Sequence, residues 1–152
     1  MPTHYQSKEL RKGRYSESGR QYLITLVTVN RERLFTSWRC AHPVIYAFKS
    51  AQQDGDVKSL CWVIMPDHLH WLIELKNDSL SPVLGRLKSR STVAMNRLLK
   101  RKGTLWQKGF HDRALRHEED VKKVARYIVS NPVRAGLVEK IGDYPMWDAV
   151  WL

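Results

Sequence analysis

Two histidines, His68 and His70, stand two positions apart inside a largely apolar stretch of the sequence. Side chains alternate between the two faces of a β-strand, so both imidazoles would project from one face while Leu69 projects from the other. Two neutral imidazoles held close together are natural ligands for a divalent metal ion. The alternative is a pair of polar side chains on a solvated sheet face, and the spacing alone leaves both interpretations open.

A second candidate for chemistry is Tyr127, which is followed four residues later by Asn131. Residues at this spacing share a helix face, so the amide oxygen of Asn131 could act as a third metal ligand beside the phenol. Tyr127 could instead be an ordinary amphipathic residue at the edge of the core. Asn131 and Pro132 also have the pattern of an N-cap and first turn of a short helix that Gly136 ends, and this alternative stays open.

The chain carries 26 Lys and Arg against 15 Asp and Glu, a formal net charge of +11. A surplus of this size on a chain of 152 residues favours a polyanionic partner, usually nucleic acid, although solubility is the simpler explanation. The segment 79–111 has no acidic residue. Its basic residues are Arg86, Lys88, Arg90, Arg97, Lys100, Arg101, Lys102 and Lys108.

A basic arm near the N-terminus and three aromatic residues add to this interpretation. The arm contains Lys8, Arg11, Lys12, Arg14 and Arg20. Tyr15, Trp106 and Phe110 could stack on unpaired bases, as proteins that bind single strands require. We therefore expect a nucleic-acid-binding surface, with a merely solvated basic face as the alternative.

The elements that must position these residues follow from hydrophobic periodicity and turn signals. We expect strands over 22–29, 59–65 and 68–75, helices over 41–53 and 81–102, a short strand within 106–116, and a helix over 118–130. Gly103 is expected to end the second helix, and acidic residues are expected in the first turn of the last. The order β-α-β-β-α-β followed by a helix predicts an α+β, ferredoxin-like (split βαβ) antiparallel sheet with helices on one face and a C-terminal helix bearing Tyr127.

Composition indicates one domain over 1–152, with the basic arm at one end and a C-terminal tail at the other. Cys40 and Cys61 have no metal-type spacing and fit free thiols in a reducing compartment. The sequence shows neither a signal-peptide core nor an apolar run long enough for a membrane helix, so we expect a soluble, cytoplasmic protein. The tail 143–152, with Trp147 and Trp151, is expected to complete the core, and a role in covering the site is the alternative.

Two stretches resemble a known family of enzymes. The stretch 62–73, WVIMPDHLHWLI, resembles the His-hydrophobic-His (HUH) segment of single-tyrosine transposases. The stretch 127–138, YIVSNPVRAGLV, resembles the catalytic-tyrosine segment of their bacterial branch, the REP-associated tyrosine transposases. The likeness extends to the residues 11–15, 87–97 and 105–113, so it spans nearly the whole chain.

The resemblance implies a ferredoxin-like nuclease that needs Mg²⁺ or Mn²⁺. It would cut and rejoin single-stranded DNA at repetitive extragenic palindromic hairpins through a 5′-phosphotyrosine. Carried over by position, Tyr127 is the expected nucleophile, and His68, His70 and Asn131 are the expected metal ligands. The family implies a bacterial, nucleoid-associated protein that acts as a monomer or a homodimer.

Further residues are expected to support this chemistry. Asp67 could orient an imidazole, or it could simply form the turn before His68. Lys123, one turn before Tyr127, could neutralise a phosphate. The expected DNA-binding residues are Arg11, Lys12, Arg14, Tyr15, Arg86, Lys88, Arg90, Arg97, Lys108 and Lys123.

Two other functions compete with strand transfer. The same basic surface could hold a DNA or RNA hairpin without any turnover. A metal-dependent hydrolase in which Tyr127 plays no part is the third possibility. It would release its product without forming a covalent adduct.

Overall fold

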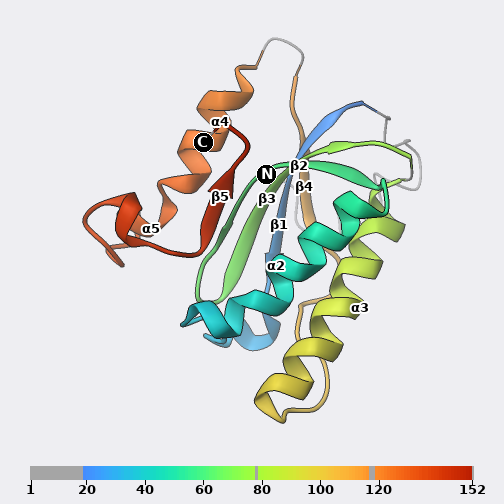
Figure 1. The fold of residues 1–152 in the computed structure, drawn as a ribbon, viewed down its shortest axis with the longest axis vertical. Helices are drawn as coiled ribbons and strands as arrows, with labels where there is room; N and C mark the ends of the chain where they lie inside the picture. Colours follow the sequence, from blue (N-terminus) through green and yellow to red (C-terminus); the bar gives the residue numbers. More distant parts are fainter. Residues whose placement is uncertain (1–18, 78, 117–118, 152) are drawn as a thin grey trace.

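The computed structural model describes residues 19–77, 79–116 and 119–151. Its strands are β1 (Gln21–Val27), β2 (Val57–Ile64), β3 (His68–Leu75), β4 (His111–Ala114) and β5 (Trp147–Ala149). Its helices are α2 (Trp38–Gln53), α3 (Leu80–Leu99), α4 (Val121–Val129) and α5 (Asn131–Arg134), with short 3-10 turns at Val29–Arg31 and Ile141–Asp143. The five strands form one antiparallel sheet in the order β4-β1-β3-β2-β5, shown in Figure 1. The expected ferredoxin-like α+β plan is confirmed, with β5 added at one edge.

The two faces of the sheet carry different helices. Leu69, Trp71 and Ile73 alternate along β3 toward α2 and α3, and all three are fully buried. The Trp71 ring lies 4.6 Å from the ring of Phe48 on α2. In Figure 1, α2 and α3 lie together on this side of the sheet and α4 lies on the other. Both β-α-β crossover helices therefore cover one face, as predicted, and the face that displays the even-numbered residues of β3 is left to α4.

The helix bounds differ from expectation at capping residues. The predicted end of α3 at Lys102 is wrong, because Lys100 adopts the left-handed conformation (φ 52°) and ends the helix after Leu99, ahead of Gly103. The predicted acidic first turn of α4 is also wrong. Asp120 lies outside that helix as its N-cap and accepts hydrogen bonds from the backbone N–H groups of Lys122 and Lys123.

The prediction that Trp106 and Phe110 stack on bases is wrong, because both side chains belong to the core. Trp106 is 3% exposed, and its indole N–H donates to the hydroxyl of Ser91 on α3 at 2.9 Å. Its ring packs against Phe35, with centroids 5.6 Å apart. The segment between α3 and β4 is therefore anchored to the protein interior, and these two rings are unavailable to a nucleic acid.

The C-terminal tail contributes to the core, as the favoured interpretation predicted, although Trp151 is 38% exposed, and it also adds the edge strand β5, which was not predicted. The hydroxyl of Tyr144 donates to the carbonyl of Ile64 at 2.6 Å, and Tyr144 and Met146 are buried. Burial raises the pKa of Tyr144 to about 12, so this phenol stays protonated and keeps donating. In the described part of the chain, no helix combines the length and apolar character needed to cross a membrane.

Candidate functional site

The two histidines lie side by side on the sheet face that α2 and α3 leave open. His68 and His70 are the first and third residues of β3, the middle strand of the sheet. Their ring centroids are 5.1 Å apart, and the ring planes are nearly perpendicular at 80°. Both are partly buried, whereas Leu69 between them points into the helix-covered core. The predicted pairing of the two imidazoles on one face is therefore present.

Each imidazole is held through its Nδ1 atom by a neighbouring side chain. The Nδ1 of His68 lies 2.7 Å from the carboxylate of Asp67, and the Nδ1 of His70 lies 2.9 Å from the hydroxyl of Thr25. Thr25 is the cross-strand partner of His70 on β1, which places its side chain on the same sheet face. Partners of this kind fix ring orientation in metal sites and leave Nε2 as the ligand atom. Sequence analysis identified Asp67 but missed Thr25, whose role depends on strand register.

The charge states of these residues suit metal binding. Burial lowers the pKa of His70 to about 4, and the positive charges of His68 and Arg134 act in the same direction. His70 is therefore neutral at pH 7, with a free lone pair. Burial alone would raise the pKa of Asp67, but the hydrogen bond from His68 and the charges of His68 and Arg31 outweigh it and lower that pKa. An ionised Asp67 makes the His68 ring a stronger donor toward a cation.

Tyr127 projects from the outer side of α4. The inner side of this helix presents Ala125, Ile128 and Val129 to the protein core, and the Sγ of Cys61 on β2 lies 4.0 Å from the carbonyl of Ala125. Tyr127 itself is 65% exposed. The helix thus packs on the sheet through its apolar side while its tyrosine stays open to solvent.

Asn131 does not continue α4. It is the first residue of α5, and Ser130 rather than Asn131 caps that short helix. The Nδ2 of Asn131 donates to the carbonyl of Ile128 at 2.9 Å, which fixes the orientation of the amide. Its Oδ1, the atom expected to bind metal, accepts a hydrogen bond from Arg134 at 2.8 Å.

Arg134 connects the residues of this cluster, and sequence analysis did not identify it. Its guanidinium carbon lies 4.0 Å from the centroid of the Tyr127 ring. One terminal nitrogen donates to the carbonyl of Tyr127 at 2.7 Å and to the hydroxyl of Ser130, and the other donates to Asn131. Its position seven residues after Tyr127 would place both residues on one face of a continuous helix, but α4 ends at Val129 and α5 begins at Asn131, so the spacing alone does not give this contact.

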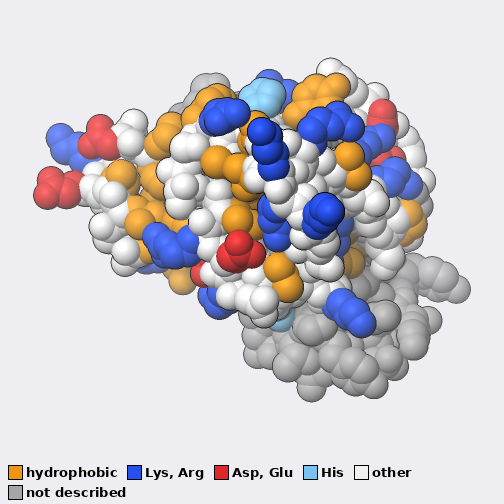
Figure 2. All heavy atoms as spheres, turned by 90° about the horizontal axis from the view of Figure 1, so that it is seen from below, with side chains coloured by type: hydrophobic (Ala, Val, Ile, Leu, Met, Phe, Trp, Pro, Cys, Tyr) orange, Lys and Arg blue, Asp and Glu red, His pale blue; other side chains and the backbone are white. Residues whose placement is uncertain are grey.

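The basic residues expected to bind DNA divide into two groups. Several already contact the protein: Arg86 pairs with Asp56 at 3.0 Å, Arg90 pairs with Asp54 at 2.9 Å, and Lys88 donates to the carbonyls of Gln107 and Gly109. Arg97, Lys108 and Lys123 form the second group, and all three are exposed. Figure 2 shows the end of the molecule where α3 finishes, with Lys and Arg side chains gathered over it. Arg11, Lys12, Arg14 and Tyr15 lie outside the described residues.

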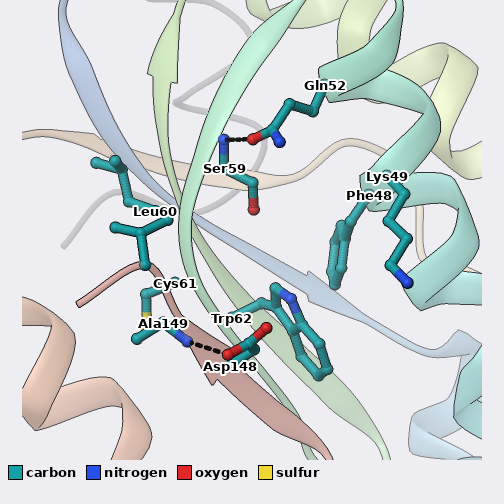
Figure 3. Close-up of a pocket in the computed structure, with 10 residues that line it drawn as sticks. Phe48, Lys49, Gln52, Ser59, Leu60, Cys61, Trp62, Asp148 and Ala149 are labelled. Carbon is teal, nitrogen blue, oxygen red and sulfur yellow. Dashed lines mark hydrogen bonds between the residues drawn. The ribbon is translucent and has the colours of Figure 1, made fainter. Parts of the chain in front are cut away.

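The hollow drawn in Figure 3 is a separate feature. It has a volume of about 210 Å³ and lies between α2 and the β2–β5 edge, lined in part by Phe48, Trp62 and Asp148. None of the candidate ligands or the tyrosine borders it. Its lining includes the thiol of Cys61 and the carboxylate of Asp148, but burial and then the negative charge of Asp148 raise the pKa of Cys61 to about 12. The thiol therefore stays protonated and is a weak nucleophile, so we do not associate the hollow with chemistry.

Comparison with known proteins gives consistent results. Residues 16–131 match the family described as "Transposase IS200 like". A REP-associated tyrosine transposase of Escherichia coli (strain K12) is 29% identical over 136 residues, which are 87% of this chain and 78% of that protein. A solved structure of a REP-associated tyrosine transposase bound to a REP hairpin has a TM-score of 0.74 and 26% identity, covering 88% of this chain and 79% of that one. A crystal structure from Deinococcus radiodurans R1 shares the fold, with a TM-score of 0.55 at 18% identity over 76% of this chain and 93% of that chain.

Proposed function

The chain belongs to the IS200-like transposase family, and from this membership we propose that it cuts and rejoins single-stranded DNA at palindromic hairpins through a covalent bond to Tyr127. One observation carries the proposal. His68 and His70, each held at Nδ1, project from the sheet face on which α4 lies. The helices α4 and α5 carry the exposed Tyr127 and the hydrogen-bonded pair Asn131 and Arg134. A protein that only binds hairpins has no need of this arrangement.

The described residues fit a divalent cation. The Nε2 atoms of His68 and His70 and the Oδ1 of Asn131 provide two nitrogen donors and one oxygen donor, and Mg²⁺ or Mn²⁺ is the ion we propose. Such an ion, when bound, polarises the scissile phosphate and offsets its negative charge. His111 on β4 carries a third imidazole, but it is less suited to this role. Thr25 on β1 pairs with His70 on one side and with His111 on the other, so His111 lies two strands away from His70.

The covalent step follows from the position of the phenol. A phenol keeps its proton at neutral pH and is a weak nucleophile, so it needs an activated phosphate. The oxygen of Tyr127 forms a bond to phosphorus, the bond from phosphorus to the 3′ oxygen breaks, and that oxygen takes up a proton while the exposed phenol loses one to water. The resulting 5′-phosphotyrosine ester conserves the bond, so a 3′-hydroxyl can attack it and rejoin strands without ATP.

The DNA would lie across the α4 side of the sheet and reach the basic residues around it. Lys123 lies one turn before Tyr127 on α4 and is exposed, so it can contact a phosphate close to the cleavage point. We propose that Arg97 and Lys108, together with Arg86, Lys88, Arg90 and the arm residues Arg11, Lys12, Arg14 and Tyr15, hold more distant parts of the hairpin and its flanks. The relative solved with a REP hairpin supports hairpin DNA as the substrate class.

The test is a cleavage assay on end-labelled single-stranded DNA carrying palindromic repeats of the host genome, with Mg²⁺ or Mn²⁺. We expect a protein–DNA adduct that survives denaturing gels, requires the metal, and is lost in Tyr127→Phe. Tyr46→Phe is a matched control, because Tyr46 on α2 is also 65% exposed but lies on the opposite side of the sheet.

Other outcomes would identify the competing functions. Cleavage that persists in Tyr127→Phe, with no adduct, would mean a metal-dependent hydrolase. Tight hairpin binding without cleavage, for several different repeats and with either metal, would mean a binding protein.

A further inference from the structure

Arg134 occupies the atom that the proposed metal needs. Its guanidinium donates to the Oδ1 of Asn131 at 2.8 Å, and the Nδ2 of the same amide is already committed to the carbonyl of Ile128. The amide is therefore fixed with its oxygen toward Arg134. A carbonyl oxygen has a second lone pair, but a metal ion using it would sit next to a guanidinium that cannot lose its proton.

The charge of Arg134 would also act on a cation bound at Asn131. A guanidinium nitrogen lies 2.8 Å from the Oδ1 of Asn131, so an ion bound to that oxygen would be a close neighbour of the guanidinium. Like charges repel, and the repulsion is larger for a divalent ion than for a monovalent one. Arg134 in this position therefore disfavours metal binding both by occupying a ligand atom and by repulsion.

A phosphate group would remove both obstacles. The present acceptors of Arg134 are neutral: two backbone or amide carbonyls and the hydroxyl of Ser130. A phosphodiester offers two charged oxygens in the geometry that a guanidinium binds with paired hydrogen bonds, and these are roughly twice as strong as neutral ones. Arg134 is exposed and sits on α5, a helix of four residues, so the side chain can turn toward a strand held over Tyr127.

We propose that Arg134 couples metal binding to DNA binding at this site. Its guanidinium keeps the Asn131 oxygen from the metal until a DNA phosphate draws the guanidinium to itself. This inference rests on the proposed function, since it takes His68, His70 and Asn131 as the metal ligands. Arg134 acts here as a positioning residue. The consequence is that the protein alone binds the ion weakly, and that an ordered site forms only with a strand in place.

The direct test is Mn²⁺ affinity without DNA, measured by the loss of the free-ion signal in electron paramagnetic resonance. The background is Tyr127→Phe, which keeps the ring under Arg134 and prevents cleavage. Arg134→Gln should bind Mn²⁺ more tightly, by roughly 5-fold or more, the lower end of typical coupling between sites. Arg134→Lys keeps the charge but not the forked geometry, so its affinity should fall between the two.

Two controls separate this effect from a general loss of positive charge. Arg126→Gln removes an exposed arginine from α4 that has no contact with Asn131 among the described residues, and it should leave Mn²⁺ affinity unchanged. In an Asn131→Ala background, Arg134→Gln should lose most of its effect, because the competition passes through the Asn131 oxygen. Circular dichroism checks that each variant is folded, and Arg134→Lys carries the test if Arg134→Gln is not.

A second measurement adds a hairpin oligonucleotide that was first selected for binding by gel shift. The oligonucleotide should raise the Mn²⁺ affinity of the Tyr127→Phe parent more than that of the same chain with Arg134→Gln. The inference is overturned if Arg134→Gln binds Mn²⁺ no more tightly than the parent, or if Arg126→Gln shows the same gain. If no variant binds Mn²⁺ with or without DNA, the metal site of the proposed function fails and this inference fails with it. If all variants bind Mn²⁺ equally and the chain that keeps Tyr127 still forms a metal-dependent adduct, the coupling is rejected while the proposed function stands.

Discussion

The two faces of β3 hold their side chains in place by different forces. On the α2–α3 face, Leu69, Trp71 and Ile73 are fully buried and are held by close contact with apolar neighbours. On the α4 face, His68 and His70 are held by hydrogen bonds at single atoms. Side chains one position apart thus depend on different forces, dispersion and burial on one face and directional polar contacts on the other.

The difference arises because α4 covers only part of its face. Its main contacts are with β2 and β5. On the β1–β3 part of this face, the partly buried Thr25, His68 and His70 lie beside apolar residues such as Leu72. The partly buried rings there stay in reach of solvent and ligands, whereas the opposite face is sealed. A substitution on the sealed face should therefore change stability, and one on the open face should change ligand binding.

The largest expected effect is on the sealed face. Trp71→Ala should lower the free energy of unfolding by about 3–5 kcal/mol, because it empties a fully buried site beside Phe48 and removes the hydrogen bond from Nε1 to the Ser59 hydroxyl. His70→Ala, one residue away, should cost about 1 kcal/mol while abolishing metal binding. Urea unfolding followed by tryptophan fluorescence and circular dichroism measures both. Equal losses of stability would contradict the proposed division between the faces.

The next effect is on ligand orientation. Thr25→Val keeps the shape of the side chain but removes the hydroxyl that holds the Nδ1 of His70 at 2.9 Å. We expect metal affinity to fall by about 10–100-fold, the usual cost of losing such a partner, with little change in stability. Titration of Mn²⁺ measures the affinity, and Thr25→Ser should restore it. A loss that Thr25→Ser does not repair would indicate a packing defect instead.

The pH dependence of stability should also separate the faces. The pKa of His70 is about 4 in the folded protein, below the ordinary 6.5 that the unfolded chain keeps. Between these values the unfolded state binds one proton more, so stability falls as the pH decreases from 6.5 toward 4 and levels off below. From pH 6.5 to 5 the metal-free protein should lose up to about 2 kcal/mol through this residue.

Unfolding curves at both pH values, for the parent chain and for His70→Gln, isolate this contribution. The variant should show a smaller loss over the same interval, since glutamine does not titrate. An identical loss would mean that His70 is not the group responsible.

Much of the sheet and part of the site followed from the sequence. Two apolar runs, 59–65 and 68–75, separated by the turn signal Pro66-Asp67 predicted the β2–β3 hairpin. The alternation of side chains along a strand then placed both imidazoles on one face. The sequence could not supply what depends on register or on a break in a helix. Thr25 meets His70 only because β1 and β3 pair in a particular register, and Arg134 reaches Tyr127 only because α5 restarts at Asn131. Trp106 was misjudged because an aromatic residue in a basic segment has the same pattern whether it is buried or exposed.

The smallest expected effects concern the basic residues, and they test how far DNA extends beyond the open face. Lys123→Ala should weaken hairpin binding and lower the slope of log K against log salt by roughly one unit, as expected for a phosphate contact next to Tyr127. Arg97→Ala, on the exposed side of α3, should show a smaller change because it lies on the helix-covered side of the sheet. Arg90→Ala should show the least, since Arg90 must give up its ion pair with Asp54 at 2.9 Å before it can bind a phosphate. Binding measured at several salt concentrations gives this order. A reversed order, with Arg97 and Arg90 ahead of Lys123, would place the hairpin mainly over α3 and would mean that only its single-stranded flank reaches the histidine face.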